Sequence, residues 1–487
     1  MALYSSQLLK TPTTHSQYSF FRLLDTSWCI FTETAISTGL RAIHPIRSHI
    51  LSVLSKITRG KITLITESET LDFGEADAQL HATLRVKRDA FWMRVALFTD
   101  LGLAEAFMFG DVDCEDISSL IQILIANRRE LTTDTILASL LSKGRSLTSR
   151  RFLGSLVNSK ANISAHYDLG NTMFSAYLSQ DMNYSSAIFE DYNEDLDPAT
   201  AARESLEDAQ LRKVRFILKK AKIGSGQRVL EIGTGWGSLA ILAAKTFNCT
   251  VETVTLSSNQ AALARKRIEE ANLTDKITVH CMDFRECKSK PEWAASFDAF
   301  ISVEMIEHVG KNFFNDYWAV ADWALKPDTG IGVVQGITIP EARVASYDVS
   351  ADFVQKWVSA TYLFFAIADK RQVFPGGYLP SFSFWVQTLN ESSKGRLVVD
   401  SVVNIGPHYA RTLREWKRRF IANWEGIVAK ALVQEYNLDA QGLEIFRRKW
   451  IYYFDYCEAA FKTRTLGDHI VTFTREGHIA FGCDAEV

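Results

Sequence analysis

A short glycine-rich segment, Val229-Leu-Glu-Ile-Gly-Thr-Gly-Trp-Gly-Ser238, has the residue types and spacing of a ligand-binding turn. An apolar, β-branched run leads into three alternate glycines, and a helix-like run comes next. Gly233, Gly235 and Gly237 allow positive φ and close approach of a ligand to the backbone. Such a strand, turn and helix N-terminus is where an α/β sheet binds a nucleotide-like ligand. Glu231 adds a carboxylate that could meet a positively charged group.

The spacing of this motif narrows the ligand class. It is not the GxGxxG of dinucleotide-binding enzymes. It resembles ExGxGxG, the first motif of S-adenosylmethionine (SAM) methyltransferases, and this resemblance implies a sulfonium ligand rather than a pyrophosphate. Thr234 and Trp236 belong to the same predicted site, and Thr255, Leu256 and Ser257 lie at the end of the next candidate strand.

The composition is that of a large globular protein with balanced charge. The chain has 487 residues, 47% of them hydrophobic, a formal net charge of -3 and a pI of about 6.4. This balance gives no global attraction to nucleic acid or to an anionic membrane, so we expect no nucleic-acid partner. Two basic runs, residues 212–222 and 411–419, could each form a local patch or a solvated helix face.

The spacing of the cysteines and the length of the apolar runs indicate in which cellular compartment the protein resides. Seven scattered cysteines without a CxxC pair argue against a disulfide framework and against a metal site. A reducing, cytoplasmic environment therefore fits best. No apolar run reaches the ~18 residues of a membrane span, and the N-terminus lacks the pattern of a secretory signal.

Four regions succeed one another along the chain. Residues 1–47 show no clear period and stay unassigned. Residues 48–127 predict a small α+β domain, because two runs alternate like strands and two others are helix-like. Residues 128–160, rich in Ser, Thr, Lys and Arg, predict a helical linker. Residues 161–487 predict a doubly wound, mostly parallel α/β sheet, with ligands at the carboxyl ends of its strands. Its candidate strands are 228–232, 250–255, 277–281, 299–303 and 331–335.

Further motifs are spread over about 300 residues, and their order is informative. They are His166-Tyr-Asp-Leu-Gly-Asn171, Met182-Asn-Tyr-Ser-Ser-Ala-Ile-Phe-Glu190, Ala209-Gln-Leu-Arg-Lys213, Val254-Thr-Leu-Ser-Ser-Asn-Gln260, Glu304-Met-Ile-Glu-His-Val-Gly310, Phe374-Pro-Gly-Gly-Tyr-Leu-Pro-Ser381 and His408-Tyr-Ala-Arg-Thr-Leu413. Together they resemble the cyclopropane-fatty-acyl-phospholipid synthase and mycolic acid cyclopropane synthase family. The region upstream resembles the N-terminal domain of its longer members, and residues 335–337 and 450–464 look more like the plant and fungal branch.

The resemblance implies a SAM-dependent C-methyltransferase that adds a methylene across a double bond of an unsaturated lipid acyl chain. An alkene must attack the methyl of a sulfonium, and the carbocation that results is stabilised by aromatic faces. Tyr167, Tyr184, Phe189 and Tyr409 are expected to supply those faces. The expected partners are unsaturated phospholipids at a membrane surface, met by a peripherally associated enzyme that could form a homodimer.

In the family, the proton lost on ring closure goes to a bound bicarbonate. The resemblance maps the ligands of this ion onto Ser186, Glu307, Gln335, Ile337 and Tyr409. Ser186 stands where many members have Cys, and Gln335 where bacterial members have His. Both side chains can still hydrogen bond to an anion.

The resemblance completes the predicted site. His166 joins the catalytic group, and Tyr184 is placed both there and at the cofactor. Gln260, Asp283 and Phe284 join the predicted SAM pocket.

One segment, residues 358–372, has no counterpart in the family. It is apolar where a surface loop should be polar. Its first residues, Val-Ser, and its last, Gln, can be encoded by splice-site sequences. A retained intron and an added helix that contacts acyl chains or the membrane are therefore both open.

Other functions stay open as well. The product could be methyl-branched or carry a methylene group, and the acceptor could be a sphingoid base. A catalytically inactive protein that binds SAM or lipid is the alternative from another functional class.

Overall fold

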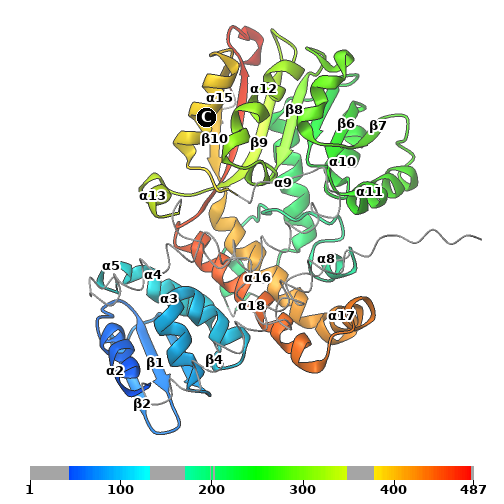
Figure 1. Ribbon diagram of the computed structural model, residues 1–487. Coiled ribbons are helices and arrows are strands. Elements are labelled where there is room, and N and C mark those ends of the chain that lie inside the picture. The colour runs from blue at the N-terminus through cyan, green and yellow to red at the C-terminus, as the bar shows by residue number, and fades with distance from the viewer. Residues whose placement is uncertain (1–42, 132–170, 198, 201–202, 348–377, 484–487) are drawn as a thin grey trace, which may run out of the picture.

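The computed structural model describes residues 43–131, 171–197, 199–200, 203–347 and 378–483. Within these residues, two β-sheets are joined by a layer of C-terminal helices, which lies between them in Figure 1. No helix in this part of the chain has the length and apolarity needed to cross a membrane.

Two predicted segments fall largely or wholly outside the described residues. They are the linker, of which only α5 (Arg128–Leu131) is described, and the apolar insert at 358–372. Both predictions therefore stay untested.

The first sheet has four strands in the order β2-β1-β3-β4. β1 pairs parallel with β3 and antiparallel with β2. Alternate residues of β1, Ile62 and Leu64, are fully buried, which is the period of two expected for a strand with one covered face. The elements of this unit are α2 (Ile43–Leu54), β1 (Lys61–Ile65), β2 (Thr70–Gly74), β3 (His81–Val86), α3 (Ala90–Met108), β4 (Val112–Cys114) and α4 (Ile117–Ala126).

The second sheet has seven strands in the order β10-β11-β9-β8-β5-β6-β7. The five from β9 to β7 are parallel, and β11 runs antiparallel between β9 and β10. The prediction of a doubly wound, mostly parallel α/β sheet is thus confirmed. Its strands are β5 (Arg228–Ile232), β6 (Thr250–Thr255), β7 (Ile277–Cys281), β8 (Ala299–Val303), β9 (Ile331–Thr338), β10 (Leu397–Asn404) and β11 (Gly467–Arg475).

Helices cover both faces of this sheet (Figure 1). On β5, Val229 packs in one buried cluster with α9 to α11, whereas Leu230 and Ile232 pack in the opposite cluster with α12 and α15. A strand covered on both faces is apolar throughout rather than alternating, as parallel strands are. The helices are α9 (Leu206–Lys220), α10 (Ser238–Phe247), α11 (Ser258–Glu270), α12 (Phe314–Ala324), α13 (Val344–Tyr347) and α15 (Phe382–Ser393).

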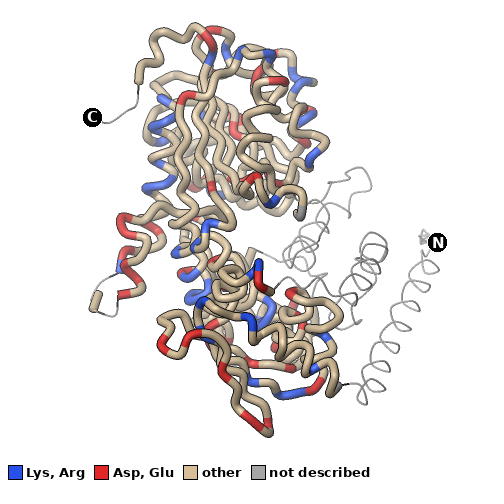
Figure 2. Tube along the Cα trace, turned by 90° about the vertical axis from the view of Figure 1, so that its left-hand side faces the viewer, with Lys and Arg blue, Asp and Glu red and all other residues tan. Residues whose placement is uncertain are grey.

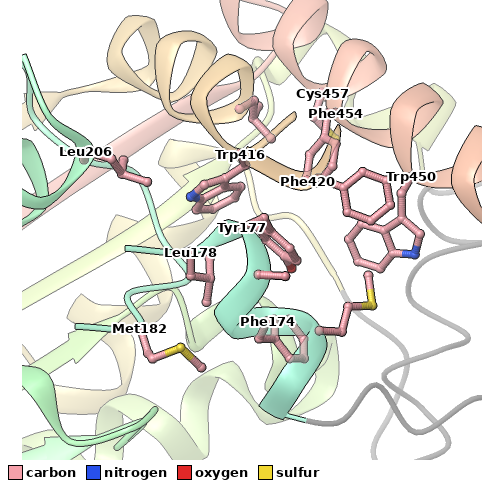
Figure 3. Packing of buried hydrophobic residues seen from close by; sticks show 14 of the residues in the cluster. Phe174, Tyr177, Leu178, Met182, Leu206, Trp416, Phe420, Trp450, Phe454 and Cys457 are labelled. Carbon is pink, nitrogen blue, oxygen red and sulfur yellow. The ribbon is translucent and has the colours of Figure 1, made fainter. Parts of the chain in front are cut away.

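The C-terminal helices form an aromatic layer that the sequence analysis did not predict. They are α16 (Gly406–Ala422), a π-helical turn (Trp424–Val428), α17 (Ala429–Tyr436) and α18 (Ala440–Lys462). Tyr177, at the end of α8 (Asn171–Tyr177), lies among Trp416, Trp450 and Phe454 (Figure 3). α18 also packs on α3 and α4, so this layer connects the N-terminal unit to the sheet.

Most of the basic run at 411–419 is not a solvated helix face, because acidic side chains of the chain pair with it. Arg411 is fully buried and pairs with Glu194, and Arg414 pairs with Asp195. Lys417 pairs with Asp455 in the same way. Figure 2 likewise shows acidic and basic residues interspersed along the described trace.

Replacing Arg411 by Met should lower the free energy of unfolding by about 1–3 kcal/mol, because a fully buried side chain loses its hydrogen bonds to the carbonyl oxygens of Asp191 and Glu204. Arg411 ties α16 to Glu194 and to the carbonyl of Asp191, and its guanidinium lies 4.2 Å from the ring centroid of Phe189. Urea unfolding measures the change. Lys266→Met, in an exposed pair on α11, is the control and should cost under about 1 kcal/mol. Equal effects of the two changes would contradict a structural role for Arg411.

Candidate functional site

The glycine turn comes directly after β5. Gly233, Gly235 and Gly237 have φ of 105°, 51° and 84°, which side chains rarely adopt. A Cβ atom built on Gly235 would meet no heavy atom within 4 Å. The turn therefore presents open backbone just ahead of α10, which begins at Ser238.

Glu231 lies beneath this turn and is 3% exposed. Its Oε2 accepts a hydrogen bond from Thr253 Oγ1 at 2.5 Å, and Thr253 also hydrogen bonds to Thr234 Oγ1 at 2.7 Å. Burial raises the pKa of Glu231 to about 8. A cation bound nearby would favour the ionised carboxylate, so this site suits a positively charged ligand.

The end of β6 supplies the next predicted residues. Thr255 Oγ1 hydrogen bonds to Gln260 Oε1 at 3.2 Å. Ser257 Oγ accepts a hydrogen bond from Gln260 N at 3.2 Å and so caps α11, while Leu256 is half-buried between them. Because β6 is the neighbour of β5, these residues flank the glycine turn at the same edge of the sheet.

Asp283 and Phe284 come after β7 and are buried. The Asp283 carboxylate accepts three hydrogen bonds from Arg285, at 2.7 to 2.9 Å, and one of them caps a short 3-10 helix. Both carboxylate oxygens therefore have a partner within the chain. A carboxylate has about four lone-pair sites, so a further donor can still bind.

Aromatic side chains meet next to the turn. Tyr184 stacks on Trp416 with centroids 5.1 Å apart, and its hydroxyl lies 3.0 Å from that of Tyr453. Tyr409 stacks on Phe461 at 4.3 Å and meets Trp416 edge-on at 5.9 Å. These contacts fix the orientation of both predicted tyrosines.

Two other predicted aromatic residues have buried side chains. Phe189 lies beneath the Arg411 guanidinium and belongs to the same buried cluster as Tyr409 and Trp416. Trp236 is also buried, and its Nε1 donates to Asn171 Oδ1 at 2.8 Å.

Glu304, the residue after β8, gathers the predicted anion ligands. Its Oε1 accepts hydrogen bonds from Ser186 N and from Gln335 Nε2, each at 2.8 Å. Its Oε2 accepts one from the Tyr409 hydroxyl at 2.6 Å. Three of the five predicted bicarbonate ligands therefore contact a carboxylate of the chain itself.

The backbone at Glu304 is strained. Its φ is +46°, in the left-handed region that favours glycine. A non-glycine residue there costs on the order of 1 kcal/mol or more, and such strain is often found at functional sites. Placing a carboxylate at this point therefore costs the folded chain some stability.

Glu307 lies one turn further on. Its Oε1 accepts a hydrogen bond from Ile337 N at 2.5 Å, and its Oε2 has no hydrogen-bond partner among the described residues. Burial, together with the charge of Glu304, raises the pKa of Glu307 to about 8. At neutral pH this carboxyl group therefore mostly holds its proton.

Asp468 and Lys213 complete the cluster, and both are fully buried. Asp468 Oδ2 accepts from Gln335 Nε2 at 2.9 Å, while burial and the charge of Glu304 raise the pKa of Asp468 well above its usual range. Lys213 donates to Ser185 Oγ, and burial lowers its pKa. Isolated buried charges are costly, so the favoured state balances the charge of Lys213 with one ionised carboxylate. Burial raises the pKa of Glu304 as well, but three hydrogen bonds to its carboxylate favour the charged form, which assigns the negative charge to Glu304.

The residues at the turn fit SAM. The open face at Gly235 would be filled by any side chain, and a buried carboxylate, Glu231, lies beneath it. Thr255 and Gln260 add polar groups beside the turn.

The same region does not fit a bicarbonate ion. Ser186 N, Gln335 Nε2 and the Tyr409 hydroxyl donate to Glu304, and Ile337 N donates to Glu307. The Ser186 hydroxyl donates to a backbone carbonyl at 3.1 Å. Of the five predicted ligands, only Glu307, when protonated, has a donor left for an added anion, which would lie beside the Glu304 carboxylate. No step is therefore assigned to bicarbonate.

Three members of the cluster were not among the predicted site residues. Two predicted residues fall in a part of the chain that the structure does not describe. Glu304 and Lys213 lie inside the recognised motifs, and a charged residue next to an apolar run was the available signal. Asp468 comes from an unpredicted strand and gave no such signal. His166 and Tyr167 lie outside the described residues.

Comparisons with known proteins agree with this geometry. The family model described as mycolic acid cyclopropane synthetase matches residues 155–469. Tuberculostearic acid methyltransferase UfaA1 of Mycobacterium tuberculosis is 30% identical over 404 residues, covering 83% of this chain and 86% of that protein. The cyclopropane-fatty-acyl-phospholipid synthase of Escherichia coli is 31% identical over 404 residues, covering 81% and 88%.

A solved structure shows the same fold. Coclaurine N-methyltransferase bound to N-methylheliamine and SAH aligns with a TM-score of 0.53 at 19% identity, over 77% of this chain and 99% of that one. The glycine turn at the carboxyl end of β5, the family match over more than half of the chain and the two relatives lead to one assignment. The chain belongs to the mycolic acid cyclopropane synthetase family and is a SAM-dependent methyltransferase.

Proposed function

We propose that this enzyme transfers a methyl group from SAM to a double bond in the acyl chain of an unsaturated phospholipid and closes a cyclopropane ring. The observation that carries the proposal is the proximity of the glycine turn to the aromatic and carboxyl groups. A Cβ built on Gly233 would lie 3.2 Å from Met305 Cβ, and Met305 adjoins Glu304. An aromatic centre beside SAM suits an apolar acceptor.

The residues of the site have separate tasks in this reaction. SAM supplies a methyl group carried by a positively charged sulfonium. The turn at Gly235 lets the ligand approach the backbone, and Glu231 favours its positive charge. The rings of Tyr184 and Tyr409 offer negative π faces to positive charge on the acyl chain. Their stacked, half-buried to buried setting excludes water that would capture that charge.

Methyl transfer without ring closure is the second candidate. One relative is named a methyltransferase and another a cyclopropane synthase, so membership of the family is compatible with both outcomes. Both reactions begin with the same attack of the alkene. They differ in which proton leaves, and therefore in where the base lies.

A peripheral position at a cytoplasmic membrane surface is part of the proposal. Ile421, Ile427 and Val433, on α16, α17 and the turn between them, are 39–44% exposed. Apolar side chains of this kind lose unfavourable contact with water when a lipid surface covers them. This supports an approach of the C-terminal helical layer to the lipid.

Expression of the chain in a bacterial host with unsaturated phospholipids should add one CH2 unit to their acyl chains. Mass spectrometry of the extracted lipids detects the gain, and fragmentation distinguishes a ring from a branch. The modification of a sphingoid base instead would show a different acceptor. Lipids identical to those of a host carrying an empty vector would contradict the proposal and favour an inactive binding protein.

Gly235→Val should weaken SAM binding by at least about 10-fold, because a branched side chain would fill the space that the ligand needs. Isothermal calorimetry measures the affinity. Gly226→Val is a matched control, because Gly226 also has a positive φ, of 76°, and an open surrounding, yet it lies at the other end of β5. Equal losses of affinity in the two variants would show that strain, and not the ligand site, is responsible.

Glu307→Gln should flatten the pH dependence of stability. The folded pKa of about 8 lies above the value of about 4.3 expected for an unfolded chain, so the folded state binds more protons. The stability that this group contributes is complete below about pH 4 and falls as pH rises through 8, by up to about 1.4 kcal/mol per pH unit. Urea unfolding between pH 6 and 9 should show the smaller slope, whereas Glu270→Gln on the exposed face of α11 should retain the wild-type slope. An unchanged slope in Glu307→Gln would contradict the protonated state.

A further inference from the structure

We infer that the carboxylate of Glu304 is the base that removes the proton during ring closure, so that the chain carries its own base in place of a bound anion. The inference rests on the proposed function, because it concerns the second half of that reaction. It assigns a catalytic role to a residue that the family resemblance did not mark.

The carboxylate of Glu304 accepts the hydrogen bonds that a bound anion would accept at this site. Ser186 N, Gln335 Nε2 and the Tyr409 hydroxyl all donate to its two oxygens, at 2.6 to 2.8 Å. The three donors come from separate parts of the chain and converge on one carboxylate. A free anion would need the same donors, so Glu304 and such an ion exclude each other.

The surrounding charges keep Glu304 ionised. Lys213 is fully buried, and its positive charge acts on both Glu304 and Asp468. Asp468 can hydrogen bond to the Glu304 carboxylate when it holds a proton. Burial raises the pKa values of Glu304, Glu307 and Asp468 alike. Glu304, however, accepts hydrogen bonds from three donors, whereas the Glu307 carboxyl group accepts one from Ile337 N and the Asp468 carboxyl group one from Gln335 Nε2. The hydrogen bonds therefore favour the negative charge on Glu304 and the protons on the other two groups.

The position of Glu304 places it beside the reacting groups. It adjoins Met305, whose side chain lies against the glycine turn, and it hydrogen bonds to Tyr409 of the aromatic group. As a residue Glu304 is half-buried, whereas Ser186 and Gln335, which hold its carboxylate, are fully buried. A carboxylate that donors hold in this position can take a proton from a substrate bound beside it.

The step balances without another reactant. Attack of the alkene on the sulfonium methyl forms a carbon–carbon bond and breaks the sulfur–carbon bond, which leaves positive charge on the acyl chain. Glu304 then takes a proton from the new methyl group, and the carbon–hydrogen electron pair forms the last bond of the ring. Glu304 becomes a neutral acid and returns the proton to solvent after the product leaves.

The first test is Glu304→Gln in the full-length enzyme. Cyclopropane formation should fall by about 100-fold or more, as for loss of a general base, while SAM affinity measured by calorimetry changes less than about 3-fold. The control is Glu252→Gln, which removes another hydrogen-bonded carboxylate of the same sheet, held by Arg228 and His280. Its activity should stay within about 3-fold of wild type. Activity of Glu304→Gln within this range would overturn the inference.

The second test is Glu304→Gly, which suits the positive φ and leaves three donors free. In buffer freed of carbon dioxide it should be inactive, and added bicarbonate or formate should restore at least about 10-fold activity, because either anion can occupy the vacated donors. The wild type should not respond to either anion. A wild-type enzyme that loses activity when bicarbonate is removed would overturn the inference.

An isotope label distinguishes a catalytic role of Glu304 as the base from a purely structural role. With SAM that carries a CD3 group, a ring keeps two deuterium atoms, whereas proton loss from the acyl chain keeps all three. Glu304→Gln should shift any residual product toward three deuterium atoms. Residual product with an unchanged ring fraction would overturn the role of Glu304 as base. A wild-type enzyme that adds no CH2 unit to any lipid would instead refute the proposed function, and this inference with it.

Discussion

The site depends on burying four ionisable groups together without leaving a charge unbalanced. Glu304, Glu307, Asp468 and Lys213 are held where few waters can solvate them, and an isolated charge there would be costly. The cost is met by directed hydrogen bonds to one carboxylate, by protons on the other two and by a nearby ammonium group. Every element that meets at this point contributes one part of that balance.

The order of the strands explains how residues far apart in sequence reach this point. β8, β9 and β11 are neighbours in the sheet, and they bring Glu304, Gln335 and Asp468 together. The register pairs Asp468 with Ile337, whose N–H donates to Glu307. Because β11 runs antiparallel to β9, its first residues, Asp468 among them, lie beside the last residues of β9. α16 then adds the Tyr409 hydroxyl, and the aromatic layer around Trp416 fixes that helix.

Features that arise from local patterns could be predicted from the sequence. The glycine turn, the five parallel strands and the family motifs each depend on residues that are consecutive in the sequence. The structure has the turn and the strands where the sequence predicts them. The antiparallel strands β10 and β11 and the C-terminal layer were not predicted, because their positions depend on pairing with distant segments. The pairing of the basic run at 411–419 with acidic residues could not be predicted for the same reason, because Asp195, the partner of Arg414, lies more than 200 residues earlier. Charge patterns in sequence report composition, whereas the structure decides which charges meet.

The hydrogen bonds of this cluster also explain why glutamine suits position 335. Its single amide nitrogen donates two hydrogen bonds, one to Glu304 and one to Asp468. A neutral histidine, the residue expected from the bacterial pattern, has only one N–H and could not donate to both carboxyl groups. A protonated histidine would add a second cation beside Lys213 and upset the charge balance. Ser186 is under a weaker constraint, because its backbone N–H makes the contact to Glu304 and its hydroxyl turns away to the carbonyl of Ala187. The substitution at 335 is therefore coupled to the presence of Glu304, whereas the one at 186 is not.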